Sequence, residues 1–324
     1  MRPPPGVGSN GPDLVTSAAV GRALEANVAR VVLDAGEAAR LAVATVLAGG
    51  HLLLEDRPGV GKTLLAKALA RSIGATFARV QATADLLPSD LTGVSVFDPA
   101  SRTWQFHPGP LFAQVVLVDE VNRATPRAQS ALLEAMAEGQ VSVDGQTRPL
   151  ARPFIVLATQ NPADEAGTFP LGDGQRDRFA AVVSLGLPAR DAERALLTGH
   201  GGEGELSQLG PVASPAELLA ATEGLAHVHA EPVVVDYVLD VVEASRRHPQ
   251  VVLGASPRAG LMLLRVARAL AVLGERGYVL PDDVKQAAPA VLGHRLGLAG
   301  GRADLAAGRA LVAEMLATVR APAP

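Results

Sequence analysis

The first 187 residues alternate short apolar runs with stretches of helical spacing. The short runs end in turns or polar residues, as buried strands do, and they cover residues 51–54, 77–81, 115–118, 154–158 and 181–185. Apolar residues at helical spacing predict helices at 18–33, 36–47, 62–73 and 126–138. Strands that alternate with helices in this way build a mainly parallel sheet flanked by helices on both faces. The pattern therefore predicts an α/β fold.

Two segments depart from this alternation and carry the period-two pattern of strands. Val94 and Val96 precede a turn that leads to Trp104 and Phe106. Further on, residues 141–143 run into an Asp-Gly pair, which favours a tight type I′ turn. Both segments are predicted as β-hairpin insertions. The aromatic side chains of the first hairpin could stack on nucleic-acid bases, although cross-strand packing or contact with a protein is the commoner use.

From residue 188 onward the strand pattern nearly disappears. Predicted helices cover 188–197, 214–225, 232–246, 256–274, 281–291 and 302–319, and residues 199–205 are predicted as a loop. A length of 324 residues also favours two domains, at roughly 100–200 residues each. We therefore expect a flexible tail at residues 1–13, an α/β core at 14–187 and a smaller all-helical domain at 188–324.

Composition narrows the class of protein. The formal net charge of -4 provides no overall positive field to gather phosphates, so a dedicated nucleic-acid-binding protein is disfavoured. The absence of cysteine excludes disulfides and sulfur-ligated metals. No run approaches about 20 uninterrupted apolar residues, and residues 1–12 lack an apolar signal core, so we expect a cytoplasmic protein without a membrane span.

The loop between the first predicted strand and its helix has the composition of a phosphate-binding loop. It runs through Pro58, Gly59, Val60, Gly61, Lys62, Thr63 and Leu64. The glycines let backbone N–H groups surround phosphate oxygens, Lys62 can reach the β and γ phosphates, and the Thr63 hydroxyl can bind Mg²⁺. Only three of the 29 Lys and Arg residues are lysines, so a lysine here is informative. The alternative is a glycine-rich helix start with a solvated lysine.

The match is to the relaxed form of this motif. The strict pattern Gly-x-x-x-x-Gly-Lys-Thr requires a glycine at position 56, where this chain has Asp56. The position of the loop between a strand and a helix therefore supports the prediction of a phosphate-binding loop more than its match to the motif does.

Three polar residues follow the ends of two later strands. Asp119 and Glu120 come directly after the run 115–118, and Asn161 follows the run 154–158. The carboxyl ends of parallel strands meet at the edge where open α/β sheets bind ligands. We expect Asp119 to hold Mg²⁺, Glu120 to orient and deprotonate the attacking water, and Asn161 to contact the γ-phosphate or that water. Taken singly, an exposed acidic turn and an Asn-Pro turn would explain the same residues.

These residues belong to an ordered series of motifs that resembles the MoxR family of AAA+ ATPases over residues 15–320. The motifs lie, in chain order, at 50–63, 85–94, 119–126, 129–136, 158–162, 177–179 and 255–259. The resemblance implies a P-loop AAA+ core followed by a helical lid. It also implies that residues 59–63 are Walker A, Asp119 and Glu120 are Walker B, and Asn161 is sensor 1.

The resemblance also assigns two arginines. Arg178 takes the place of the arginine finger, which reaches the nucleotide of a neighbouring subunit, with Arg176 and Arg123 as alternatives. Arg258 takes the place of sensor 2, reaching over from the lid. Independently, Arg258 puts a cation in the first turn of a helix, where the macrodipole disfavours it, and a nearby phosphate would resolve that conflict.

The chain departs from the family just before the proposed finger. Family members commonly carry Pro-Glu-Ala-Gln-Leu before Asp-Arg-Phe, whereas residues 172–176 of this chain are Gly-Asp-Gly-Gln-Arg. Because Gly172 and Gly174 give the backbone more freedom, this departure puts the rigidity of the finger in question.

The resemblance implies Mg²⁺-dependent ATP hydrolysis by a ring, a hexamer, with ATP and Mg²⁺ as cofactors. It further implies chaperone-like remodelling or maturation of a partner protein, often one with a von Willebrand factor A domain. Two alternatives stay open. Related rings with similar hairpins act on nucleic acid, and a nucleotide-gated binding scaffold with little turnover would need the same nucleotide site.

Overall fold

The computed structural model describes residues 12–161, 167–299 and 305–322, and its centre is one parallel sheet. The strand order is β2 (Phe77–Gln81), β5 (Val115–Asp119), β8 (Ile155–Gln160), β1 (Leu52–Glu55) and β9 (Ala181–Val183). All neighbouring pairs are parallel, so the predicted sheet is confirmed. Because the strands run the same way, the chain leaves all of them at one side, here called the carboxyl edge, and enters them at the opposite amino edge.

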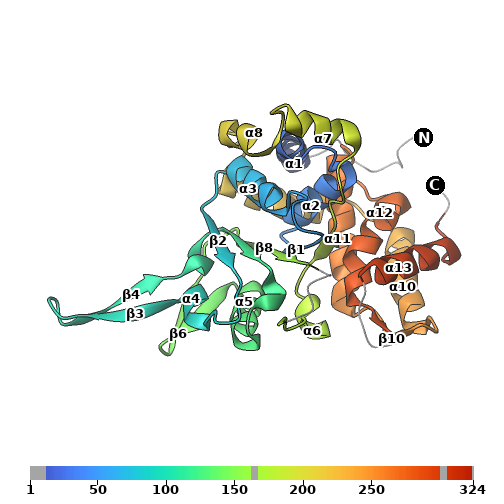
Figure 1. The fold of residues 1–324 in the computed structure, drawn as a ribbon. Coiled ribbons are helices and arrows are strands. Elements are labelled where there is room, and N and C mark those ends of the chain that lie inside the picture. The colour runs from blue at the N-terminus through green and yellow to red at the C-terminus, as the bar shows by residue number, and fades with distance from the viewer. Residues whose placement is uncertain (1–11, 162–166, 300–304, 323–324) are drawn as a thin grey trace.

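Helices cover both faces of the sheet (Figure 1). Leu52 and Leu54 of β1 belong to the buried cluster that contains α1 (Pro12–Val31), α2 (Gly36–Leu47) and α3 (Lys62–Ile73). Leu53 belongs to a second cluster, which contains α5 (Pro126–Glu138). Side chains alternate across a strand, so a strand that is buried on both faces must be apolar throughout. This explains the short apolar runs of the sequence.

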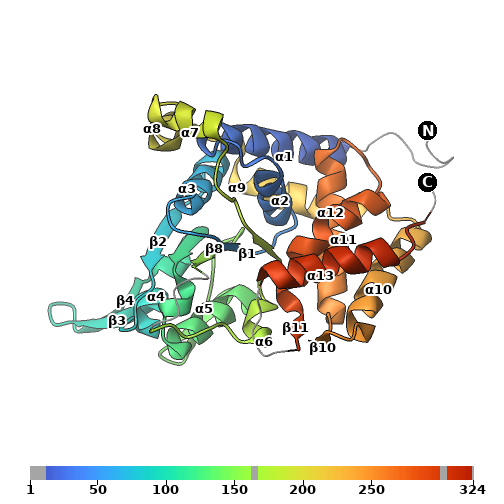
Figure 2. The same ribbon diagram turned by 45° about the vertical axis from the view of Figure 1, so that its right-hand side comes forward.

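Both predicted hairpins are present. The first joins β3 (Gly93–Asp98) to β4 (Thr103–Pro108) and projects from the body of the molecule (Figures 1 and 2). The second joins β6 (Gln140–Val143) to β7 (Gln146–Pro149) through Asp144 and Gly145, both of which have positive φ as a type I′ turn requires. Between the strands lie three short helices: α4 (Pro88–Thr92), η1 (Pro110–Phe112) and η2 (Val121–Arg123).

The C-terminal part is mainly helical, as predicted. After the short α6 (Asp173–Arg176) and β9, the chain forms α7 (Arg190–Leu197), α8 (Gly202–Gln208), α9 (Pro215–Gly224), η3 (Leu225–His227), α10 (Pro232–Arg247), α11 (Pro257–Leu273), α12 (Pro281–Leu292), η4 (Gly293–Arg295) and α13 (Leu305–Thr318). A small antiparallel ribbon of β10 (Val251–Leu253) and β11 (Gly297–Leu298) was not predicted. Strands of two or three residues are too short to show a period.

The predicted loop at 199–205 is wrong, because α8 begins at Gly202. Glu203 of this helix forms an ion pair with Lys67 of α3 at 2.7 Å, and Glu205 pairs with Arg30 of α1 at 3.1 Å. Leu206 is buried against the core. The partners lie 136 and 175 residues away along the chain, so local composition could not reveal them.

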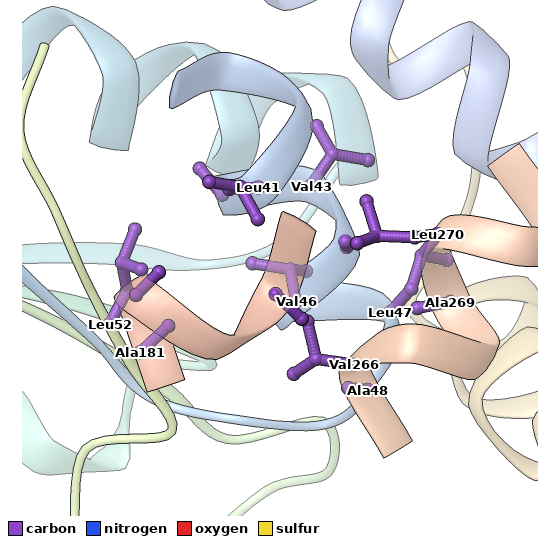
Figure 3. Close-up of a cluster of buried hydrophobic side chains, with 14 of the residues drawn as sticks. Leu41, Val43, Val46, Leu47, Ala48, Leu52, Ala181, Val266, Ala269 and Leu270 are labelled. Carbon is purple, nitrogen blue, oxygen red and sulfur yellow. The ribbon is translucent and has the colours of Figure 1, made fainter. Parts of the chain in front are cut away.

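The helical C-terminal part from residue 188 onward, which the family resemblance identifies as the lid, packs onto the core through α2. Figure 3 shows Val46 and Leu47 of α2 between the β1 residue Leu52 and the α11 residues Val266 and Leu270. One buried cluster thus runs from the sheet into the lid, and the domain boundary between residues 187 and 188 stays a prediction. At the other end, α1 begins at Pro12, inside the predicted tail, and residues 1–11 of that tail lie outside the described residues. No helix in the described ranges is long and apolar enough to cross a membrane.

Candidate nucleotide-binding site

The predicted phosphate loop connects β1 to α3 at the carboxyl edge. Gly59 and Gly61 have φ values of 84° and 100°, in the left-handed region that favours glycine. Gly61 is the N-cap of α3, and no side chain caps the N–H groups of the first turn. Exposed N–H groups and the positive end of the helix dipole suit an anion such as phosphate.

Lys62, the first residue of α3, lies over this loop. Its Nζ donates to the carbonyl oxygen of Asp56 and, at 3.3 Å, to that of Arg57. Partial burial lowers the pKa of Lys62, and the carboxylates of Asp56, Asp119 and Glu120 act in the opposite direction. The ammonium group at the start of α3 and the carboxylates at the end of β5 thus belong to one region of the carboxyl edge.

Asp56 explains the departure from the strict glycine motif. Its carboxylate accepts hydrogen bonds from the Ser184 hydroxyl at 2.9 Å and from the backbone N–H groups of Gly186 and Arg57 at 2.7 and 2.9 Å. Burial acts to raise the pKa of Asp56, but these hydrogen bonds outweigh it and hold the pKa below its usual value. Asp56 therefore ties the phosphate loop to the segment that leads from β9 towards α7, which a glycine could not do.

Asp119 is the last residue of β5 and is buried. One carboxylate oxygen accepts from Arg79 Nε at 2.7 Å, and the other accepts from the Thr159 hydroxyl at 3.3 Å. Carboxylate and hydroxyl oxygens such as those of Asp119 and Thr63 are ligands that Mg²⁺ prefers. The described residues contain no group of three or more His, Asp or Glu that could hold a metal ion alone. The donors therefore fit an ion that takes its other ligands from phosphates and water.

Glu120 has a φ of 56°, which is uncommon for a residue with a side chain. Its backbone N–H donates to the Thr159 hydroxyl at 2.9 Å. Its carboxylate accepts from Gln81 Nε2 at 3.1 Å and from Arg123 Nη1 at 3.0 Å. These contacts turn the chain sharply after β5 and hold the carboxylate at the carboxyl edge.

Three of these partners were not predicted from the sequence as site residues: Arg79, Gln81 and Thr159. Arg79 and Gln81 are two residues apart on β2, and Gln81 is level with Asp119 across the β2–β5 pair. Alternating polar residues in an otherwise apolar strand could have marked them as facing a site. The sequence did not show which strand lies beside β5, because the strand order in a sheet depends on pairing between residues far apart in the chain.

The loop also borders a hollow that suits an apolar ring. Gly59, Val60, Gly61 and Leu64 line it together with residues 31–35, which connect α1 to α2, and with parts of the segment after β9. Pro58 does not line this hollow. Asn161 comes directly after β8 at the same edge and is partly buried. Pro162, the last residue of its motif, lies outside the described residues.

Arg178 lies at the opposite edge. Ala181, the first residue of β9, pairs with Leu52, and the Ala180 N–H donates to the His51 carbonyl at 2.8 Å, so the Asp-Arg-Phe motif precedes β9 at the amino edge. Arg178 forms no ion pair with another described residue. The two alternatives do have carboxylate partners: Arg123 pairs with Glu120, and Arg176 pairs with Asp173.

Arg258 is also at the amino edge. Burial, with a smaller effect of Arg258, lowers the pKa of His51 to about 4, and burial, again with a smaller effect of Arg258, lowers the pKa of Arg295. His51 immediately precedes β1, so both groups on which Arg258 acts lie towards the amino edge. The cause is the position of the lid, whose residues 293–295 pack against the start of β9. Within one chain, Arg178 thus lies at the edge opposite the phosphate loop, and Arg258 acts on groups at that same edge.

Both parts of the chain resemble known proteins. Residues 51–181 match the family described as "ATPase family associated with various cellular activities (AAA)", and residues 243–315 match the AAA lid domain. The chain is 42% identical over 304 residues to the uncharacterized protein YeaC of Bacillus subtilis, covering 94% of this chain and 95% of that protein. It is 39% identical over 278 residues to chaperone MoxR1 of Mycobacterium tuberculosis, covering 83% and 73%.

A solved structure shares the whole architecture. A crystal structure from Cytophaga hutchinsonii, whose description proposes an ATPase, superposes with a TM-score of 0.84 at 32% identity. The alignment covers 96% of this chain and 97% of that one. The likeness thus includes the core and the lid.

Proposed function

Because this chain belongs to the MoxR family of AAA+ ATPases, we propose that it hydrolyses ATP with Mg²⁺ in a hexameric ring and remodels a partner protein. One observation carries the proposal: the carboxylates of Asp119, at the end of β5, and Glu120 act on the Lys62 ammonium group beside a glycine loop at the carboxyl edge of the sheet. Neither a solvated lysine nor an isolated acidic turn would require that arrangement.

The residues of the site divide the chemistry among them. The N–H groups of residues 59–63 and the Lys62 ammonium would hold the phosphates, while Thr63 and Asp119 would hold Mg²⁺, which neutralises charge on the phosphate oxygens when bound. Glu120 would accept a proton from the attacking water, and Asn161 would orient that water or the γ-phosphate. The hollow beside Leu64 would take the adenine ring.

The two remote arginines support a ring. A single chain presents its phosphate loop at one edge of the sheet and Arg178 and Arg258 at the other, so a head-to-tail neighbour would supply both to the site. In this arrangement no subunit is complete alone. Arg258 then acts on the nucleotide bound by the neighbouring subunit instead of the nucleotide bound by its own subunit.

We expect Arg178→Ala to bind ATP normally and to lose hydrolysis by at least about 10-fold, since the finger stabilises transition-state charge. Mixing equal amounts of Arg178→Ala and Lys62→Ala subunits is expected to restore activity at about one site in four, because an intact loop then meets an intact finger. Hydrolysis of the mixture, compared with each variant alone, is the measurement. Absence of any rescue would contradict action across the interface.

The hairpins favour a protein as the partner. Trp104 is 71% exposed, and a hollow between the two hairpins is lined by Trp104, Phe106 and Arg148. The Arg148 guanidinium lies 3.9 Å from the centre of the Phe106 ring, so this cation is already engaged with an aromatic face. A surface of this kind, with both apolar and polar groups, suits a polypeptide. We propose that the partner protein has a von Willebrand factor A domain, as the family resemblance implies.

The test compares hydrolysis with a purified von Willebrand factor A domain protein, with single- and double-stranded DNA, and with no addition, at physiological salt. We expect the protein to stimulate hydrolysis and DNA to leave it unchanged. Stimulation by DNA alone would instead support the nucleic-acid motor. Equally negligible hydrolysis by the unmodified chain and by Glu120→Gln, with or without these additions, would leave only the binding scaffold.

A further inference from the structure

The lid residue Arg295 is buried beneath the segment that carries Arg178. Its side chain is only 3% exposed. Its Nε donates to the Asp177 carboxylate at 2.7 Å, its Nη2 donates to the carbonyls of Phe179 and Asp177 at 2.7 and 3.3 Å, and its Nη1 donates to the carbonyl of Ala180 at 3.1 Å. One side chain of the lid thus binds the backbone on both sides of Arg178.

The rest of the guanidinium is anchored in the lid. Its Nη1 also donates to the carbonyl of Val291, one turn earlier. The preceding residue, His294, is buried and places its Nε2 3.1 Å from the Phe179 carbonyl and its Nδ1 3.1 Å from that of Ala290. Burial and the adjacent Arg295 hold the pKa of His294 well below 6.5. A neutral imidazole has one N–H and donates to only one of these carbonyls, so Arg295 supplies most of the contact.

The segment that leads into Arg178 from the N-terminal side is largely exposed. Helix α6 (Asp173–Arg176) has no buried residue, and a Cβ added at Gly174 would meet no atom within 4 Å. On this side the restraints are mostly local: the Gly172 N–H donates to Gln175 Oε1 at 2.8 Å, Arg176 pairs with Asp173, and the preceding Leu171 is buried. Figure 2 shows α6 at the margin of the molecule beside β11 of the lid. Directly around Arg178, the hydrogen bonds from the lid come from Arg295, beside the buried Phe179.

We propose that Arg295 is a positioning residue that couples the lid to the finger, so that movement of the lid moves Arg178 relative to the neighbour's nucleotide. A planar fork that makes four hydrogen bonds to residues 177–180 transmits displacement in a way that a single point contact does not. The inference rests on the proposed action of Arg178 across the subunit interface.

The test uses Arg295→Lys, which keeps the charge and loses the fork. We expect ATP binding within about twofold of the unmodified protein, hydrolysis reduced by about 10-fold, and partial recovery on mixing with Lys62→Ala subunits, which carry an intact finger. Hydrogen exchange in unassembled protein should be faster in the peptide covering 172–180 and unchanged in α3. A purely structural role would lower the melting temperature without recovery on mixing.

Arg276→Lys is the matched control. Arg276 forms a comparable two-contact ion pair with the buried Asp283, but both residues belong to the lid and neither touches residues 177–180. We expect it to lower stability and to leave hydrolysis per folded subunit unchanged. If Arg295→Lys does not fold, Asp177→Asn replaces it, because the amide keeps the shape and one acceptor while removing the charge.

The outcomes separate the two proposals. If Arg178→Ala is not rescued on mixing, its action across the interface is wrong and the role of Arg295 falls with it. If Arg178→Ala is rescued, but Arg295→Lys and Asp177→Asn hydrolyse ATP like the Arg276→Lys control, only the positioning role is overturned. Unchanged exchange in the 172–180 peptide would contradict the positioning role independently of any activity.

Discussion

Glu120→Gln is expected to bind ATP and to lose about 10²–10⁴-fold in hydrolysis, because an amide cannot accept the proton of the attacking water. The substitution preserves the shape of the side chain and an oxygen that can accept from Gln81 or Arg123. ATP should therefore stay bound, and the ring should be more stable with ATP than that of the unmodified protein. Steady-state phosphate release, equilibrium binding of ATP and sedimentation with ATP measure the three properties.

Glu134→Gln provides the matched control. Glu134 is an exposed residue of α5, the first α-helix after Glu120 in the chain. We expect this variant to bind and hydrolyse ATP at the unmodified rate. Hydrolysis by Glu120→Gln within about threefold of that of Glu134→Gln would rule out Glu120 as the base.

Lys62→Ala is expected to weaken ATP binding by about 100-fold and to abolish measurable hydrolysis. In the structure the ammonium group is held over the loop by the carbonyls of Asp56 and Arg57, and the carboxylates of Asp119 and Glu120 act on it electrostatically. Hydrogen bonds to a charged group contribute about 1.5–3 kcal/mol each, so loss of one or two phosphate contacts accounts for this factor. Titration with a fluorescent ATP analogue measures the change.

Lys67→Ala controls for the loss of a lysine from the same helix. Lys67 forms its ion pair with Glu203 of α8, away from the loop. Exposed pairs of this kind contribute at most about 1 kcal/mol to stability, and we expect ATP binding to be unaffected. Equal loss of binding in both variants would mean that Lys62 acts through the helix and not through phosphate.

Local pattern predicted the strands and helices of the core well because each element carries its own evidence. Helices α2, α3 and α5 begin and end at the predicted residues, and all five sheet strands lie within two residues of their predicted bounds. A strand buried on both faces must be apolar along its length, whatever it packs against. The evidence for the hairpin turn at Asp144 and Gly145 was also local, since type I′ turns require residues that tolerate positive φ.

Residues whose role depends on a distant partner were not predicted. In the sequence nothing distinguishes Arg79 from the other arginines. Its contact with Asp119 exists because β2 pairs with β5. Arg295 lies 118 residues beyond Asp177, and no periodicity connects them. The helix α8 formed where glycines indicated a loop, because Glu203 found a partner on α3.

The order of strand, glycine loop, helix and acidic strand end was sufficient to indicate a phosphate site, since the chain direction through a parallel sheet brings those ends to one edge. The tertiary structure alone decided the pairing of β9 with β1, which sets Arg178 at the opposite edge, and the packing of the lid, which buries Arg295 beneath that segment. Burial of a charge requires a partner of good geometry, and such a partner is found only once the chain has folded.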